Sequence, residues 1–153
     1  MDIKYVTPFI VAFNNVSRNL GFQKVQKGAL QNKKKTIIGE GVIIVVGVSG
    51  HLKGNVVYVI DDQGAKKIAS VMMSGAAVEK LDKIAKSALV EMTNIVTSHA
   101  ATAFAAMNVL IGLSSPACFE GNDVEITMSS DTVFCIQMLL DDIPIDVNIS
   151  FED

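Results

Sequence analysis

The chain has 153 residues, a formal net charge of −3 at pH 7 and 50% hydrophobic residues. A chain of this length can bury about 70% of its unfolded surface in one core, so residues 1–153 are expected to form a single domain. The longest nearly unbroken apolar run, at 41–47, is far shorter than the roughly 18 residues of a membrane span, and the slightly acidic charge excludes a broad nucleic-acid surface.

Residues that hold metals or phosphates are sparse. Cys118 and Cys135 have neither C-x-x-C spacing nor a neighbouring histidine, which favours two buried strand residues over a zinc site. There is no glycine-rich phosphate loop and no nucleophile motif, so no cofactor of the chain's own is expected. No basic segment precedes an apolar one after Asp2, so we predict no secretory signal and a cytoplasmic location.

The first twenty residues carry apolar side chains at helical spacing, and Gly21 is a natural helix stop. Two starts are open for this helix. Asp2 can be the N-cap, with Pro8 bending the first turns, or Thr7 can be the N-cap, with Pro8 at the first helical position. We favour the longer helix.

Three strands are predicted next, a weak one at 24–30, a strong one at 36–49 whose glycines allow a bulge, and a third at 54–60. Short connections between them imply an antiparallel meander, with the three lysines at 33–35 at a solvated hairpin tip. His51 falls in the turn at 50–53, where we expect an exposed and structurally neutral imidazole.

Two helices follow. Asp61 or Asp62 caps the first, which ends at Gly75. The second is predicted over 79–108, because that segment has no internal glycine or proline, and would be roughly 30 residues long. His99 falls on its apolar side, where we expect a core or interface histidine that bonds a backbone carbonyl.

The last third of the chain reads as strands. Residues 109–120 are expected to form a loop or short edge strand that leads to a turn at 121–123. Strands are predicted at 124–129, 133–140 and 143–151, and Pro144 indicates that the last one lies at an edge. The order of elements predicts an α+β fold, a mostly antiparallel sheet with long helices packed on one face.

One stripe of the long helix is polar. At 100° per residue, Ser87, Glu91, Asn94 and Ser98 fall within about 60° of one another. Such a stripe is ordinarily the solvated face of an amphipathic helix. Glu91 and Asn94, however, place a carboxylate beside a carboxamide that both donates and accepts hydrogen bonds. Ser87, Glu91 and Asn94 in this spacing, followed downstream by Pro116, form a more restrictive pattern.

This pattern resembles the signature of the CheC/CheX family of chemotaxis phosphatases, which remove the phosphoryl group from the response regulator CheY. The strand at 54–60 and the helix after it also look like family segments, so the resemblance covers most of the chain. CheC proteins carry a second Glu-x-x-Asn pair on the first helix. Here Asn14 and Asn15 have Val11 and Ala12 three residues earlier, so the chain is similar to the single-site CheX type.

The resemblance implies a protein phosphatase, a hydrolase of the two-component signalling system that cleaves the aspartyl phosphate of a CheY-type response regulator. Glu91 would pair with a lysine of the regulator, Asn94 would hold the attacking water, and Pro116 would shape the surroundings, with Ser87 and Ser98 as supporting motif residues. Mg²⁺ would belong to the regulator. The family also suggests a homodimer joined through the sheets. A non-catalytic homodimeric adaptor that binds a response regulator is the alternative.

Overall fold

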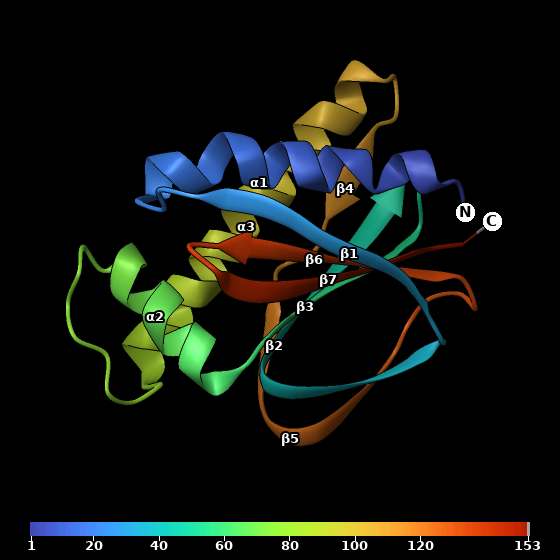
Figure 1. Ribbon diagram of the computed structural model, residues 1–153. Helices are drawn as coiled ribbons and strands as arrows, with labels where there is room; N and C mark the ends of the chain where they lie inside the picture. The colour runs from blue at the N-terminus through green and yellow to red at the C-terminus, as the bar shows by residue number, and fades with distance from the viewer. Residues whose placement is uncertain (153) are drawn as a thin grey trace.

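Seven strands and three α-helices succeed one another in nearly the predicted order (Figure 1), and the computed structural model describes residues 1–152. A 3-10 turn, η1 (Ile3–Tyr5), precedes the first α-helix. The helices are α1 (Thr7–Leu20), α2 (Asp62–Met72) and α3 (Lys83–Ala106). The strands are β1 (Val25–Lys33), β2 (Thr36–Gly50), β3 (Gly54–Ile60), β4 (Ile111–Leu113), β5 (Ala117–Thr127), β6 (Val133–Leu140) and β7 (Ile143–Phe151).

The strands form one antiparallel sheet in the order β1-β6-β7-β3-β2-β4, and β5 also pairs with β2. The predicted meander is therefore right for β2 and β3 and wrong for β1, which pairs with β6. In β2, one edge pairs with β3 over Val42–Val48 and the other pairs with β4 and β5, whereas β1 pairs along its length with β6. The lysines at 33–35 end β1 and link it to β2, so they are not a hairpin tip.

The turn predicted at 121–123 is also wrong, because β5 continues through it as one strand. Gly41 pairs with Gly121 and Gly39 pairs with Val124, so β5 carries an additional residue there and bulges. Gly41 itself has φ of +99°, and a Cβ atom there would overlap the Ile60 carbonyl oxygen. Bulges and turns draw on the same residue types, which is why sequence did not separate them.

The last strand is central rather than at an edge. β7 lies between β6 and β3, contrary to the expectation from Pro144. Proline is tolerated because β3 begins to pair with β7 only at Asp146, two residues later. The predicted turn before β7 is confirmed, since Asp141 and Asp142 have φ of 48° and 66° between β6 and β7.

Two helix starts differ from expectation. Asp2 caps only η1, where its Oδ1 accepts from the Lys4 amide at 2.9 Å, and α1 begins at Thr7 with Pro8 in its first turn. The favoured longer helix is therefore wrong, and Gly21 does end α1, with φ of +114°. The helix predicted over 79–108 is shorter at both ends, because Asp82 is its N-cap and accepts from the Ala85 amide at 2.8 Å.

The end of α3 and the start of α2 are also set by residues next to them in sequence. The helix α3 stops at Ala106, and Asn108 after it adopts a left-handed backbone with φ of 60°. For α2, Asp61 rather than Asp62 is the cap, and its Oδ1 accepts from the Gly64 amide at 2.6 Å.

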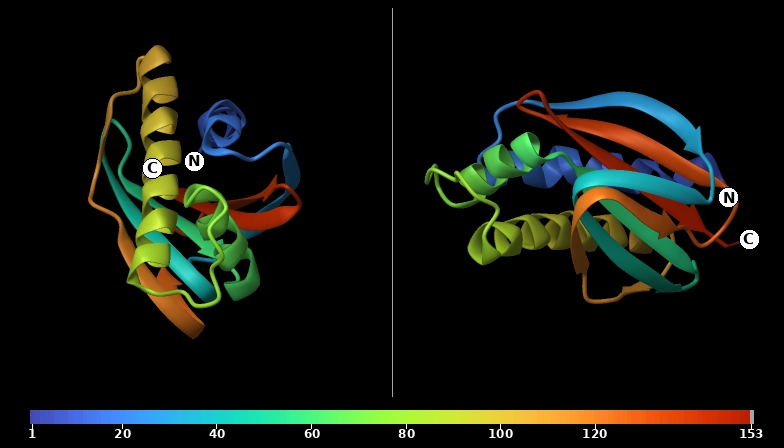
Figure 2. Two further views of the ribbon diagram at one scale, coloured as in Figure 1. Left: turned by 90° about the vertical axis from the view of Figure 1, so that its left-hand side faces the viewer. Right: turned by 90° about the horizontal axis from the view of Figure 1, so that it is seen from below.

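The helices pack on one face of the sheet, so the predicted α+β class is confirmed. The left view of Figure 2 shows α1 almost end-on and α3 along its length, so the two helices cross rather than run parallel. Phe104 of α3 joins these layers, with ring centroids 5.9 Å from Phe9 of α1 and 6.2 Å from Phe151 of β7. Among residues 1–152, no helix combines the length and apolar character needed to span a bilayer.

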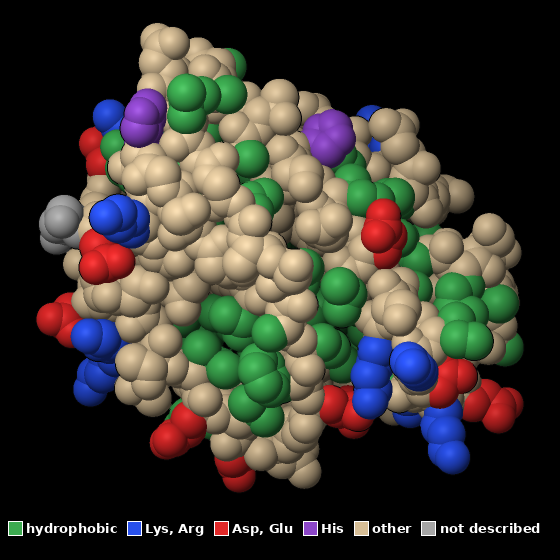
Figure 3. All heavy atoms as spheres, turned by 180° about the vertical axis from the view of Figure 1, so that it is seen from behind, with side chains coloured by type: hydrophobic (Ala, Val, Ile, Leu, Met, Phe, Trp, Pro, Cys, Tyr) green, Lys and Arg blue, Asp and Glu red, His purple; other side chains and the backbone are tan. Residues whose placement is uncertain are grey.

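The opposite face of the sheet carries a smaller core. Its members come from β2, β3, β6 and the turn after β5, and are Ile37, Ile43, Val57, Met128 and Val133. From behind, hydrophobic side chains gather low on the surface (Figure 3). Phe119 of β5 and Ile38 of β2 are two large hydrophobic residues that remain exposed, at 46% and 64%. The β5 end of the sheet is therefore less polar than the β1 end, where most residues are exposed and hydrophilic.

Candidate functional site

The two faces of α3 differ sharply in burial. The face toward the core consists of Ala85, Leu89, Met92, Thr93, Val96, Thr97, Ala100 and Phe104. Ser87, Glu91, Asn94 and Ser98 are all exposed, as the helical spacing predicted. His99 is exposed as well, so the core alternative of its prediction is wrong, and the interface alternative stays a prediction. His99 follows Ser98 around the helix, outside the buried arc.

Glu91 and Asn94 lie side by side on this exposed face. Within residues 1–152, neither side chain has an intramolecular hydrogen bond or ion pair. Both lie in the middle of a regular helix of 24 residues, so their backbone positions are fixed although their side chains are free. A carboxylate and a carboxamide held this way can receive groups from outside the chain without first breaking internal bonds.

The helix is tied to the sheet one turn beyond Asn94. Thr97 Oγ1 donates to the Thr93 carbonyl at 2.6 Å, and Tyr58 OH of β3 lies 2.6 Å from the same Thr97 oxygen. Because the single Thr97 hydroxyl proton is already used, Tyr58 is the donor. Burial raises the pKa of Tyr58 well above its usual range, although the bond to Thr97 lowers it slightly, so the donor stays protonated. This buried contact positions the turn that presents Asn94.

Two further contacts hold the ends of α3. Lys86 Nζ lies 2.9 Å from Glu120 Oε1 of β5, and that bond together with the Glu120 charge raises the pKa of Lys86. Beyond the other end, His51 Nδ1 accepts from the Leu110 amide and the His51 amide donates to the Leu110 carbonyl, each at 2.9 Å. His51 is exposed, as expected. It is not structurally neutral, contrary to the prediction, because it pairs with the segment that follows α3.

A pocket of about 380 Å³ lies beside Glu91. It is formed where the first turns of α3 face the start of β5, and it is lined by Lys83, Lys86, Ser87, Val90, Glu91 and Cys118. Ser87 and Glu91 are thus brought together with residues that sequence reasoning did not select. The sequence offers only a weak signal for these missed residues. Helical spacing places Lys86 and Val90 on one helix face, but nothing in the sequence indicates that Cys118, from a distant strand, lies opposite them.

Pro116 lies in the connection between β4 and β5, two residues before Cys118 of the pocket. Ser114 anchors this connection to β2, because its Oγ accepts from the Gly47 amide at 2.7 Å and its amide donates to the Gly47 carbonyl at 2.9 Å. Asn94 and Ser98 do not line the pocket and continue the exposed stripe beyond it. The four predicted residues of α3 therefore form a line along the helix with the pocket at one end, and Pro116 lies apart from them in the β4–β5 connection.

The cysteines differ in burial. Cys135 of β6 is buried, and that burial raises the pKa of its thiol to about 11. Cys118 of β5 is only half-buried at the pocket, and desolvation likewise raises the pKa of its thiol. The prediction of two buried strand residues is right for Cys135 and only partly right for Cys118.

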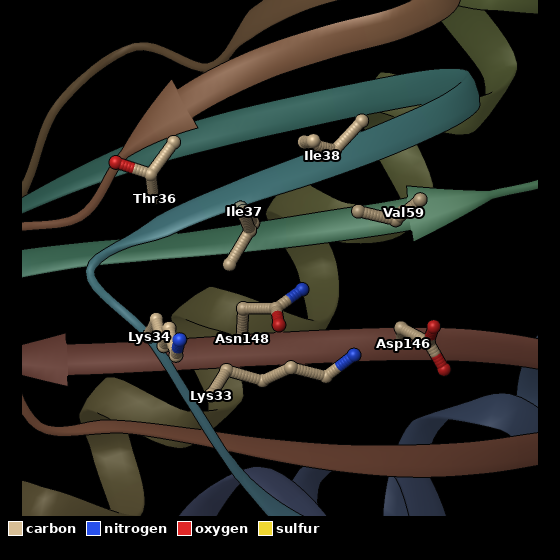
Figure 4. A pocket seen from close by; sticks show the side chains of 8 residues that line it. All are labelled: Lys33, Lys34, Thr36, Ile37, Ile38, Val59, Asp146 and Asn148. Atoms are coloured by element: carbon tan, nitrogen blue, oxygen red, sulfur yellow. The ribbon is translucent and has the colours of Figure 1, made fainter.

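A different hollow lies on the other face of the sheet, away from the helices. Its lining includes Lys33 and Lys34 together with Asp146 and Asn148 of β7, and the Lys33 side chain extends toward Asp146 (Figure 4). It has a volume of about 310 Å³ and contains none of the predicted site residues. The Asn148 side-chain amide donates to the Val57 carbonyl at 3.2 Å, so it serves as a hydrogen-bond donor within the sheet. Among residues 1–152, no three His, Cys, Asp or Glu side chains are grouped as metal ligands.

Comparison with known proteins gives consistent matches. A family model described as Chemotaxis phosphatase CheX matches residues 42–139. The protein named CheY-P phosphatase CheX from Thermotoga maritima is 24% identical over 126 residues, covering 82% of this chain and 81% of that protein. The crystal structure of a CheC-like superfamily protein from Shewanella has a TM-score of 0.86 at 20% identity, covering 100% of both chains. A chain of the CheX–CheY–BeF3–Mg²⁺ complex from Borrelia burgdorferi has a TM-score of 0.81 at 24% identity, covering 99% of this chain and 100% of that one.

Proposed function

The chain belongs to the CheX family of chemotaxis phosphatases, and from this premise we propose that it hydrolyses the aspartyl phosphate of a CheY-type response regulator. The observation that carries the proposal is the exposed pair Glu91 and Asn94, which is held on a rigid helix and unpaired within residues 1–152. The name of the Thermotoga relative and the Borrelia complex with CheY, BeF3 and Mg²⁺ support this substrate class.

Asn94 is proposed to orient the attacking water. An aspartyl phosphate is an activated acyl phosphate. In its hydrolysis the water oxygen bonds to phosphorus and the bond between phosphorus and the aspartyl oxygen breaks. Phosphate is released, and the aspartate carboxylate is regenerated. This reaction depends on positioning and on stabilising the developing charge. The Asn94 carbonyl oxygen can accept a hydrogen bond from the attacking water while the regulator supplies the phosphoryl group, and the water's protons leave with the released phosphate. One carboxamide is sufficient for that role.

Glu91 is proposed to dock the regulator by pairing with one of its lysines. A charge pair that is desolvated on docking fixes the register of the two proteins, and truncating one member leaves the other uncompensated. Because Glu91 lies one turn from Asn94 on the same helix, fixing Glu91 also places the carboxamide.

The test is phosphate release from a panel of the host's phosphorylated receiver domains, with and without this protein. One or a few receiver domains should lose phosphate faster in its presence, and heat-inactivated protein is the control. If no receiver domain in the panel is dephosphorylated faster, the proposed activity is wrong. The same panel identifies the regulator that serves as substrate. A cytoplasmic location and a single domain over residues 1–153 remain predictions.

Magnesium is expected to act only in the regulator. Pretreating this protein with a chelator and then removing the chelator should leave its activity unchanged when the regulator is kept in Mg²⁺. Omitting Mg²⁺ from the regulator should abolish the reaction, because the metal neutralises charge on the phosphoryl group there. Dephosphorylation rates measured after chelator pretreatment of this protein, and separately without Mg²⁺ in the regulator, check this. Activity that is lost on pretreatment and returns only with Zn²⁺ would contradict the proposal.

A homodimer joined through the sheet is proposed as the assembly. The expectation came from the family resemblance, and the two ends of the sheet differ in how well they suit it, since β1 at one end is largely polar and exposed. The β5 end fits better, because Phe119 and Ile38 are exposed there and an unpaired edge is protected by pairing with a second copy. Sedimentation should give twice the 16.4 kDa chain mass at micromolar concentration. A mass of one chain across that range would contradict the dimer.

A further inference from the structure

We infer that the pocket between the start of α3 and β5 is an anchor site for the response regulator, which places an apolar side chain in it and an acidic side chain at its lysine rim. This pocket, lined by Lys83, Lys86, Ser87, Val90, Glu91 and Cys118, is called the anchor pocket below. The inference rests on the proposed function and adds a second contact region to the Glu91–Asn94 pair.

The first reason is continuity. Ser87 and Glu91 belong both to the polar stripe and to the anchor pocket. A protein that docks on Glu91 therefore necessarily covers the mouth of the pocket. Its volume of about 380 Å³ falls in the range of about 300–1,000 Å³ that is typical of ligand sites. It has ample room for one large side chain.

The second reason is an unexplained exposed isoleucine. Ile84 is 66% exposed, the highest exposure among the large hydrophobic residues of the described chain. It lies seven residues before Glu91, so the two side chains project within about 20° of each other and about 10 Å apart along the helix. Ala88 lies between them and is half-buried. An apolar ridge beside a charged catalytic stripe is typical of the buried centre of a protein interface.

The third reason is charge and shape at the rim. Lys83 has no ion pair within residues 1–152 and provides positive charge at the rim. Lys86 is already paired with Glu120 at 2.9 Å, and this contact ties the helix to the strand that forms the opposite wall. Val90 and Cys118 contribute apolar surface beside these polar groups. This arrangement fits a partner surface in which a hydrophobic residue lies next to one carboxylate that can pair with Lys83.

The Cys118 thiol reports directly on occupancy. It lines the anchor pocket and is half-buried, whereas Cys135, the other cysteine, is only 4% exposed. Alkylation by N-ethylmaleimide above neutral pH should therefore modify Cys118 first. Adding a saturating amount of the BeF3-activated regulator should slow this modification at least 10-fold. Cys118→Ser identifies the signal, and unactivated regulator is the control for nonspecific shielding.

Variants separate docking from chemistry. Ile84→Ser and Lys83→Glu should each raise the KM for the phosphorylated regulator about 10-fold and leave kcat within about twofold of wild type. Val11→Ser and Lys67→Glu make matched changes at exposed positions on α1 and α2 and should leave both constants unchanged. Circular dichroism and thermal melting confirm that each variant is folded.

The outcomes are distinguishable. Protection of Cys118 together with raised KM supports the inference. An unchanged alkylation rate at saturating regulator, or a fall in kcat with KM unchanged, overturns it even when phosphatase activity is present. Protection of Cys118 without any phosphatase activity supports the docking site and rejects the proposed function instead.

Discussion

Asn94→Ala is expected to lower single-turnover dephosphorylation about 100-fold and to leave docking of the regulator nearly intact. Asn94 is exposed and has no bond within residues 1–152, so its removal leaves no unsatisfied partner in the core. What is lost is the group proposed to orient the water, while Glu91 and the helix remain. The effect should therefore appear in the rate at saturation and not in the affinity.

The measurement is dephosphorylation at saturating protein, together with titration of the BeF3-activated regulator. Thr102→Ala is a suitable control, because Thr102 is also exposed on α3, about two turns beyond Asn94, and is not a predicted site residue. Its rate should stay within about twofold of wild type. Equal rates for wild type and Asn94→Ala would refute the water-positioning role and leave a regulator-binding adaptor as the better account.

Glu91→Ala is expected to weaken the complex with the activated regulator by about 2 kcal/mol or more, which is roughly a 30-fold increase in Kd. The cost arises because the regulator's lysine is desolvated on docking and loses its counter-charge. Wild-type affinity should also fall as salt is added, since the pairing is electrostatic. Titration at low and physiological ionic strength measures both effects.

Glu79→Ala provides the matched control for this charge change. Glu79 is exposed and lies in the segment before α3, outside the anchor pocket, so its removal should change Kd by less than about twofold. If Glu91→Ala binds as tightly as wild type while its turnover falls, Glu91 acts in the chemistry and its docking role is wrong.

The sequence predicted strand bounds and helix caps well, because these depend on residues that are close together along the chain. The strands β6 and β7 have the predicted bounds, and Gly21 and Asp61 act as caps in the predicted way. Pairing between strands was less predictable, because β1 and β2 are adjacent in sequence and yet separated in the sheet by three strands. That choice depends on β1 meeting β6, a strand about 100 residues later, and no local pattern records it.

The candidate site shows the same division. Helical spacing alone was enough to place Ser87, Glu91, Asn94 and Ser98 on one exposed face. It could not reveal that Cys118 lines the same pocket as Glu91, because Cys118 belongs to β5, a strand that meets α3 only in the folded chain. Nor could it predict the Tyr58–Thr97 bond that positions α3, since tyrosine and threonine in a strand and a helix are ordinary residues until the two elements meet.

The first helix has a consequence for stoichiometry. Its sequence, Thr7–Leu20, contains no aspartate or glutamate, so Asn14 and Asn15 lack the carboxylate that would make a second docking pair. If the chain acts and assembles as proposed, each chain presents one docking site to the regulator, and the proposed dimer presents two equivalent sites. Under the proposed function, flux through the phosphatase should rise in simple proportion to the number of chains, with one regulator bound per chain at saturation.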